Sequence, residues 1–355
     1  MEDLEHAFRG RKVLVTGHTG FKGGWLSLWL QELGADVVGY GLAPDTDPSL
    51  FVDAGVAGSG RSIIADIRNK DALLDAIRQE RLEYVFHLAA QPLVRQSYRD
   101  PVGTFESNVM GTANLLDAVR QVDSVRSCVV VTSDKCYENQ EWTYAYRETD
   151  PLGGYDPYSA SKGAAEIVVS SFRRSFFSDN RCGVASARAG NVIGGGDWAE
   201  DRILPDCVRA LSKGERIKIR SPNAVRPWQH VLEPLYGYLM LAMSAREDPV
   251  SYSEAWNFGP MVSQYSVSKL VDDVVQAWGS GGWDDLSDPN AVHEAHYLRL
   301  DSTKANVRLG WLPKLDVKQS VDLAVAWYKH HLAGEDMRKF TLGQIRAYMR
   351  TPSRF

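Results

Sequence analysis

Short apolar runs alternate with longer amphipathic segments through the first half of the chain. The apolar runs have the length and the Val, Ile and Leu content of buried strands, and they lie at 12–15, 35–40, 61–67, 84–90, 128–133 and 183–188. Most segments between them repeat apolar residues at helical spacing. Because strand and helix alternate, the pattern predicts an α/β protein with a Rossmann-type, doubly wound parallel sheet.

The pattern changes after residue 190. It predicts helices at 205–211 and 232–245 and short strands at 217–219, 255–260 and 297–300. We expect 232–245 and 255–260 to return to the first sheet. The prediction is therefore a Rossmann domain of residues 1–190 plus about 231–262, and a smaller C-terminal α+β lobe of residues 191–230 plus about 263–355. A crevice between two such parts is a usual place for a substrate.

Gly17, Gly20 and Gly23 lie between the first strand and the first long helix. A tight turn at this point lets the backbone approach a pyrophosphate, and the helix N-terminus presents free N–H groups to it. The G-x-x-G-x-x-G spacing is one residue longer than the common dinucleotide fingerprint. Each glycine alone is equally explained by a turn that needs positive φ, but the position between strand and helix predicts a dinucleotide site.

The residues after the next strands refine this prediction. The second strand ends in Gly39-Tyr40-Gly41-Leu42, without the acid that usually holds the adenosine ribose and without an arginine for a 2′-phosphate. This favours NAD over NADP. Asp66 is suited to pairing with the adenine amino group, although it is equally suited to capping the next helix. Small residues at the C-terminal end of the fourth strand, Ala89 and Ala90, leave room for a ligand.

Tyr158 and Lys162 are four residues apart at the start of a predicted helix, so they share one face. A free tyrosine, with a pKa of about 10, is a poor base at neutral pH. A neighbouring ammonium and a hydroxyl donor stabilise the phenolate and enable proton abstraction. The alternative is a surface pair, but Ser133 at the end of the fifth strand supplies the hydroxyl and favours the catalytic interpretation.

Composition excludes several classes of function. The net charge is −5, so no basic field favours nucleic acid. Apolar runs fall short of the roughly 20 residues that span a bilayer, and the acidic N-terminus lacks the form of a signal peptide. The four cysteines have no C-x-x-C or metal-ligand spacing. We expect no metal, reduced thiols and a cytoplasmic protein.

The glycine turn, Ser133 and the Tyr158-Lys162 pair together resemble the extended short-chain dehydrogenase/reductases that act on nucleotide sugars. Within that family, four segments are similar to the 4,6-dehydratases of CDP-glucose, at residues 17–23, 132–137, 226–231 and 298–305. The likeness runs from about residue 11 to the C-terminal tail. It implies NAD as cofactor, CDP-glucose as substrate and a role in deoxysugar biosynthesis. It also implies a homodimer, formed through helices near 104–119 and 158–172.

The resemblance implies a mechanism too. Tyr158 takes the proton from the sugar O4 while hydride passes from C4 to NAD, and the same hydride later returns to C6. Asp134 matches the family's acid for the 6-hydroxyl. Lys135 occupies the position at which related dTDP-glucose dehydratases carry a glutamate base for C5. A lysine acts as a base only when neutral, which requires desolvation or nearby positive charge. The alternative for Asp134-Lys135 is a solvated ion pair.

The expected site follows residue by residue from these motifs. The expected catalytic residues are Ser133, Asp134, Lys135, Tyr158 and Lys162. The expected cofactor-binding residues are Gly17, Thr19, Gly20, Phe21, Lys22, Gly23, Asp66, Ile67, Leu88, Ala89, Ala90, Asn108, Thr132, Tyr158 and Lys162. The expected substrate-binding residues are Asn191, Arg202 and Arg226, where an arginine fork suits phosphate oxygens. Arg226 could equally be a structural partner of Glu233.

Three other functions remain open. A nucleotide-sugar 4-epimerase keeps the Tyr-Lys pair but has no use for Asp134 and Lys135. A dehydratase of a dTDP-, UDP- or GDP-linked sugar would carry out the same chemistry, and the cytidine assignment rests on the resemblance alone. A non-catalytic NAD-binding regulator would not need Ser133, Tyr158 and Lys162 together.

Overall fold

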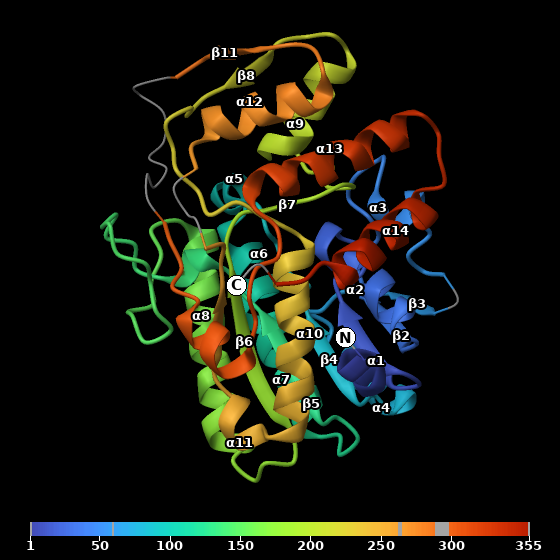
Figure 1. Cartoon of the computed structure of the whole chain (residues 1–355). Coiled ribbons are helices and arrows are strands. Elements are labelled where there is room, and N and C mark those ends of the chain that lie inside the picture. Colours follow the sequence, from blue (N-terminus) through green and yellow to red (C-terminus); the bar gives the residue numbers. More distant parts are fainter. Residues whose placement is uncertain (1, 59, 262–264, 288–297, 354–355) are drawn as a thin grey trace.

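The computed structural model describes residues 2–58, 60–261, 265–287 and 298–353. Within these residues the main sheet has seven strands, and every neighbouring pair is parallel (Figure 1). The strands are β1 (Lys12–Thr16), β2 (Asp36–Gly41), β3 (Arg61–Ile64), β4 (Tyr84–His87), β5 (Ser127–Val131), β6 (Gly183–Ala189) and β10 (Ala255–Phe258). Their order is β10-β6-β5-β4-β1-β2-β3. This confirms the predicted doubly wound sheet and puts its switch point between β1 and β4.

Two hydrophobic cores lie on the two faces of this sheet, because strand side chains alternate. Val13 and Val15 pack in one core with α2 (Phe21–Glu32) and α10 (Leu232–Glu247). Leu14 packs in the other core, which is formed with α4 (Lys70–Glu80), α7 (Gly111–Arg120) and α8 (Pro157–Phe176). Figure 1 shows α2 and α10 on one side of the sheet and α7 and α8 on the other.

The third strand is shorter than predicted. It ends at Ile64 rather than at residue 67, because Asp66 accepts the backbone N–H of Arg68 and so forms a tight turn. The N-cap of α4 is Asn69, whose side chain accepts the N–H of Ala72. The alternative that Asp66 caps this helix is therefore wrong.

The helix predicted at 104–119 is divided into three parts. It consists of α6 (Pro101–Phe105), a π-helical turn, η1 (Glu106–Met110), and α7. The Thr112 hydroxyl, at the start of α7, donates to the carbonyl of Asn108 in this turn, at 2.7 Å. Such π turns occur frequently at functional sites, and this one contains the predicted cofactor residue Asn108.

A second, smaller region follows the C-terminal end of β6. β7 (Val192–Ile193) pairs with β9 (Gln229–His230), and β8 (Ile217–Ile219) pairs with β11 (Trp283–Asp285). The helices α9 (Ile203–Ser212), α12 (Val267–Trp278) and α13 (Val317–Leu332) gather with them above the sheet in Figure 1.

The chain then returns to the sheet. As predicted, α10 covers β5 and β6 and β10 pairs with β6. The strand predicted at 297–300 is wrong in its described part. Residue 297 lies outside the described residues, and Leu300 makes only an isolated bridge to Tyr146. The boundaries of the two domains stay a prediction.

The remaining elements are short or peripheral. They are α1 (Glu2–Phe8), α3 (Leu50–Asp53), α5 (Val94–Arg99), η2 (Asp134–Cys136), α11 (Pro249–Tyr252), η3 (Ala305–Leu309) and α14 (Met337–Arg350). α14 packs against α2. Across the described ranges, all helices are too short or too polar to span a bilayer.

Candidate active site

The glycine turn between β1 and α2 is packed too tightly for side chains at two positions. Gly17 has φ +73°, and a Cβ on it would lie 2.8 Å from the backbone nitrogen of Ala89. A Cβ on Gly23 would lie 2.1 Å from the carbonyl oxygen of Gly17. Glycine at these positions therefore lets the turn fold against the end of β4 and the first turn of α2.

Gly20, the middle glycine of the turn, has open space around it. Gly20 is the N-cap of α2 and provides no side-chain cap, so the first N–H groups of the helix keep their capacity to bind an anion. A Cβ on Gly20 would have only the Gly17 carbonyl oxygen within 4 Å, at 3.4 Å. Thr19 donates its hydroxyl to the Leu42 carbonyl at 2.8 Å and fixes the turn to the end of β2. The residues present thus fit the diphosphate of a dinucleotide.

The end of β2 is filled by a histidine of the same turn. A Cβ on Gly39 would lie 2.1 Å from the His18 ring, whose Nε2 is 2.7 Å from the Ser62 hydroxyl. Burial lowers the pKa of His18 to about 4, so the ring is neutral at pH 7. This is the region in which the sequence lacks the ribose-binding acid.

Thr16 fixes the residues that follow β4. Its hydroxyl oxygen accepts the backbone N–H groups of Leu88 and Ala89, each at 3.1 Å, and lies 2.8 Å from His87 Nδ1. His87 Nε2 lies 3.1 Å from the Thr112 hydroxyl, which already donates to a backbone carbonyl. The ring therefore donates from Nε2 and accepts at Nδ1. Burial lowers the pKa of His87 to about 3, which keeps this arrangement neutral.

Asn108 bridges the loop after β4 and helix α8. Its Oδ1 accepts the backbone N–H of Gln91 at 2.8 Å, and its Nδ2 donates to the Gln91 carbonyl and to the Ser161 hydroxyl. The amide thus positions two segments around the predicted site.

Asp66 and Ile67 also contact protein groups. Both carboxylate oxygens of Asp66 accept from Arg68, which lowers the pKa of Asp66. Ile67 is buried and packs against Gly111, where a Cβ would lie 2.7 Å from its side chain. Cofactor binding by these two residues and by Asn108 stays a prediction.

Ser133, Tyr158 and Lys162 come together as the sequence predicts. Asp156 caps α8 by accepting the N–H of Ser159 at 2.9 Å, so Tyr158 and Lys162 fall in its first turns, and both are buried. Burial raises the pKa of Tyr158 to about 12, and interaction with the Ser133 hydroxyl opposes this. Lys162 Nζ donates to the Val131 carbonyl at 3.5 Å.

Asp134 and Lys135 form a turn that Ser133 caps. The Ser133 hydroxyl accepts the N–H of Lys135 at 3.2 Å and donates to Asp134 Oδ1 at 3.0 Å. Asp134 is buried, so the alternative of a solvated ion pair is wrong for its carboxylate. Burial raises its pKa, although the charges of Lys135, Lys22 and Arg226 oppose the rise. Its Oδ2 has no hydrogen-bond partner among the described residues.

Lys22 and Arg202 lie next to this carboxylate. Burial lowers the pKa of Lys22 to about 8; the charges of Arg202 and Lys162 act in the same direction, and Asp134 opposes them. Arg202 begins α9 and donates to the buried Asp197 carboxylate at 2.8 Å. We call Lys22, Asp134, Asp197 and Arg202 the Lys22 cluster. Phe21, beside Lys22, lies against Gly194, where a Cβ would be 3.0 Å from its ring.

The two other predicted substrate residues lie in the segments that flank β7 and β9. Asn191 connects β6 to β7, and its carbonyl accepts the N–H of Gln229 at 3.1 Å. Arg226 is close enough to lower the pKa of Asp134. The alternative that Arg226 pairs with Glu233 is wrong. The fully buried Glu233 instead accepts from Tyr348 and from two backbone N–H groups, at 2.7–2.9 Å.

The sequence interpretation missed Glu166. Its buried carboxylate accepts from Thr132, Ser186 and Arg188, at 2.5, 2.7 and 2.8 Å. The Thr132 hydroxyl thus donates its proton to Glu166, and its cofactor role stays a prediction. The signal was present in the spacing, because Tyr158, Lys162 and Glu166 follow one another at intervals of four on one helical face.

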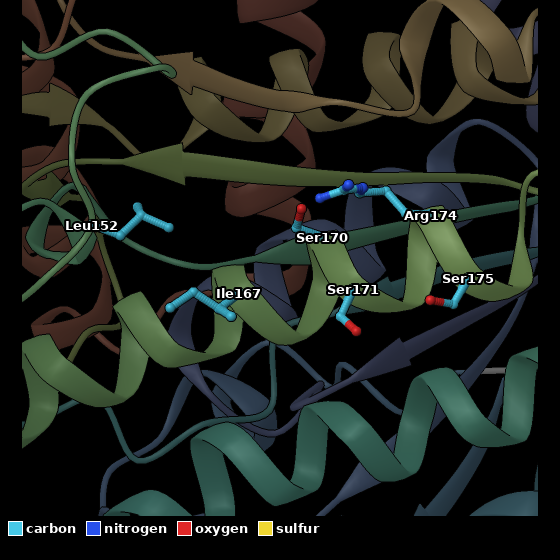
Figure 2. A pocket seen from close by; sticks show the side chains of 6 residues that line it. All are labelled: Leu152, Ile167, Ser170, Ser171, Arg174 and Ser175. Atoms are coloured by element: carbon cyan, nitrogen blue, oxygen red, sulfur yellow. The ribbon is translucent and has the colours of Figure 1, made fainter.

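A surface pocket of about 520 Å³ lies apart from this site, on the outer side of α8. Figure 2 shows its lining side chains, which all come from α8 except Leu152. They are Leu152, Ile167, Ser170, Ser171, Arg174 and Ser175, and they include no predicted site residue.

Comparison with known proteins gives consistent relationships. The family model described as GDP-mannose 4,6 dehydratase matches residues 14–323. The CDP-glucose 4,6-dehydratase of Salmonella typhimurium is 48% identical over 98% of both chains. The dTDP-glucose 4,6-dehydratase of Streptomyces antibioticus is 31% identical over 82% of this chain and 80% of its own.

Solved structures share the fold at lower identity. A Streptomyces venezuelae dTDP-glucose 4,6-dehydratase, crystallised with NAD, has a TM-score of 0.77 at 22% identity, covering 91% of this chain and 98% of its own. The UDP-glucose 4-epimerase of Thermotoga maritima has a TM-score of 0.78 at 23% identity, covering 90% and 99%. With the family model and the close sequence relatives, these matches show that the chain belongs to the GDP-mannose 4,6 dehydratase family, among the extended short-chain dehydrogenase/reductases.

Proposed function

We propose that this protein converts CDP-glucose to CDP-4-keto-6-deoxyglucose and water. The observation that carries the proposal is the 48% identity to a CDP-glucose 4,6-dehydratase over 98% of both chains. The reaction is a net elimination, in which C4 of the sugar is oxidised and C6 is reduced, so no external oxidant is consumed. The glycine turn and the N-terminus of α2 would hold NAD, which would supply the hydride acceptor for C4 and the hydride donor for C6.

Tyr158 is the proposed base for the O4 proton. Its phenolate is costly in this buried position, where the pKa is about 12. The Lys162 ammonium on the same helical face and the Ser133 hydroxyl both favour the phenolate. The cost is thereby reduced at the point where the proton is removed.

Asp134 is the proposed acid for the 6-hydroxyl, and Lys135 the proposed base for C5–H. Support for the acid is the burial of Asp134, which raises its pKa and favours the protonated form that an acid needs. Support for the base is its position, because both side chains begin from the turn directly after Ser133. Asn191, Arg202 and Arg226 are the proposed ligands of the substrate diphosphate.

We also propose a homodimer in the cytoplasm. Apolar side chains are exposed on neighbouring helices: Val102 on α6 (67% exposed), Met110 in η1 (54%) and Ile167 on α8 (59%). Exposed apolar groups on adjacent helices are typical of an interface. A Met110→Glu variant should shift the mass measured by light scattering to that of a monomer. The cytoplasmic assignment rests on the four cysteines, which are free and buried.

The decisive experiment follows an isotope through the reaction. CDP-glucose with deuterium at C4 should yield CDP-4-keto-6-deoxyglucose with that deuterium at C6, and C5 should gain a solvent proton. The appearance of CDP-galactose, or loss of the label to solvent, would refute the dehydratase. Fast turnover of dTDP- or UDP-glucose without CDP-glucose would refute only the cytidine assignment.

Two variants test the acid and the base. Asp134→Asn and Lys135→Met should still oxidise C4 but should release water at least ~100-fold more slowly, the usual size of an acid–base contribution. Reduced nicotinamide would then accumulate on the enzyme and could be followed by absorbance. Asp123→Asn, at an aspartate whose side chain is 98% exposed, is the matched control and should turn over normally.

A further inference from the structure

We propose that Glu166 is a positioning residue for the reaction: its buried carboxylate keeps Lys162 in the ammonium form beside Tyr158. This inference rests on the proposed function, because it concerns the group that assists the Tyr158 base. The relatives and the sequence motifs assign no role to Glu166.

Glu166 lies one helical turn beyond Lys162 on α8, and both are buried. Residues four apart on a helix are neighbours on its surface. The carboxylate is therefore a fixed negative charge beside the ammonium, in a place from which water is largely excluded. In such surroundings charges interact much more strongly than they do in water.

Three donors from two neighbouring strand segments fix this carboxylate. Thr132, directly after β5, donates to Oε1, while Ser186 and Arg188 on β6 donate to Oε2. Burial favours protonation of Glu166, but the Arg188 charge and the hydrogen bonds prevail and hold its pKa below the ordinary value. Glu166 is thus ionised at neutral pH. We call Thr132, Tyr137, Glu166, Ser186, Arg188 and Asn257 the Glu166 network, since Arg188 also donates to Tyr137 and Tyr137 bonds to Asn257.

The charged and titratable groups around Lys162 come from several elements. On α8 they are Tyr158 and Glu166; from α2, β4 and η2 they are Lys22, His87 and Cys136. Lys22 disfavours the ammonium, His87 is neutral, and the Cys136 thiol is kept protonated by burial, which raises its pKa. Arg188 and Arg173 face Glu166. Among these groups Glu166 is therefore the ionised one that favours the ammonium.

The expected consequence has a definite sign. Burial lowers the pKa of Lys162 to about 8, and Glu166 raises it against that effect. Without the carboxylate the pKa should fall by about one unit, the lower end for a close charge pair. More Lys162 is then neutral at pH 7–8, and Tyr158 loses its cationic neighbour.

The first test needs no substrate. The rate at which acetic anhydride labels Lys162 is measured against pH, with mass spectrometry of the peptide that carries it, because only the neutral amine reacts. In Glu166→Gln the midpoint should move about one pH unit lower than in the wild-type protein. Ser186→Ala, which removes a hydrogen bond but leaves the charge, should not move it. Equal midpoints in Glu166→Gln and the wild type, or an equal shift in Ser186→Ala, would overturn the inference.

The second test uses turnover. The rate of nicotinamide reduction with CDP-glucose should fall as pH rises through about 8 in the wild type, and about one unit lower in Glu166→Gln. Glu166→Asp keeps the charge and should restore the wild-type midpoint. A rate lowered by the same factor at every pH would indicate a purely structural role. Wild-type inactivity on CDP-glucose would contradict the proposed function and leave the labelling result standing.

A double variant that removes the Glu166 charge together with its buried partner charge controls for misfolding. Replacing Glu166 alone leaves the buried Arg188 without its counter-charge. The double variant Glu166→Gln/Arg188→Met removes both charges and should show the same shift in the labelling midpoint. An unshifted midpoint in a folded double variant would equally overturn the inference.

Discussion

Two polar clusters meet at Lys162 and differ in how completely the protein satisfies the hydrogen-bonding capacity of their carboxylates. In the Glu166 network the carboxylate accepts three hydrogen bonds and pairs with Arg188. In the Lys22 cluster, Asp134 keeps one carboxylate oxygen without a partner among the described residues, and Lys22 has a pKa lowered to about 8 by burial. The first cluster therefore holds parts of the site in place, whereas the second has charge available for a bound molecule.

This difference predicts which substitutions should lower the stability of the fold and which should lower binding or turnover. Removing one partner of a buried ion pair is strongly destabilising, because the other charge is left buried without compensation. A desolvated charge at a binding site lowers the stability of the fold. Its removal should therefore reduce binding or catalysis without reducing stability.

The largest effect is expected at Tyr158, which lies beside Lys162, where the two clusters meet. Tyr158→Phe should lower the rate of C4 oxidation by about 10²–10⁴-fold, because the base for the O4 proton is lost. Dinucleotide affinity, measured by calorimetry, should change little. Tyr155→Phe is a matched control, since this exposed tyrosine lies three residues earlier, and it should react normally. A Tyr158→Phe enzyme that keeps a tenth of the wild-type rate would show that another group is the base.

A pair of arginine variants separates the clusters by stability. Arg188→Met leaves Glu166 buried and unpaired, so it should lower the free energy of unfolding by about 3–5 kcal/mol. Arg202→Met removes a guanidinium that is 31% exposed and pairs with the buried Asp197 carboxylate. Water can replace part of this contact, so the loss should be smaller, about 1.5–3 kcal/mol, the size of a lost hydrogen bond to a charged group. Urea unfolding measures both. Equal losses of stability in Arg188→Met and Arg202→Met would contradict the distinction between the two clusters.

The smallest effect is expected in the Lys22 cluster, for binding and not for stability. Lys22→Met should weaken dinucleotide or substrate binding by about tenfold, the size of a lost hydrogen bond to a charged group. It should leave the thermal midpoint unchanged or raise it, because a desolvated ammonium is removed. Lys70→Met, at an exposed lysine on α4, is the control and should alter neither property. A large loss of stability in Lys22→Met would place Lys22 with the Glu166 network.

Local patterns carried most of what the sequence predicted. The strand runs, the glycine turn and the Tyr158-Lys162 spacing each lie within a few residues, and their geometry follows from backbone periodicity. The end of β3 was missed because it depends on the side chain of Asp66 bonding to its own backbone neighbour. The sequence left open an ion pair between Arg226 and Glu233, but in the folded protein Glu233 accepts a hydrogen bond from Tyr348.

The Glu166 network illustrates a different limit. Glu166 and Arg188 are far apart in sequence and meet only because β6 lies next to β5 and under α8. The charges that act on Lys22 likewise come from distant parts of the chain, from Asp134 and Lys162 near the sheet and from Asp197 and Arg202 near α9. Such environments have no local signature. The roles of all these residues stay predictions until the variants are measured.

The parallel pairing of β10 with β6 has a consequence for how the chain acquires its structure during synthesis. Ala255 lies opposite Ser186, so this strand leaves the ribosome only after the whole segment that forms α9, β8 and α10. Until then β6 is an open sheet edge, and unpaired edges promote association between chains. A fragment ending before residue 255 should therefore aggregate. Folding is expected to finish late, and the N-terminal half is not a unit that can be expressed alone.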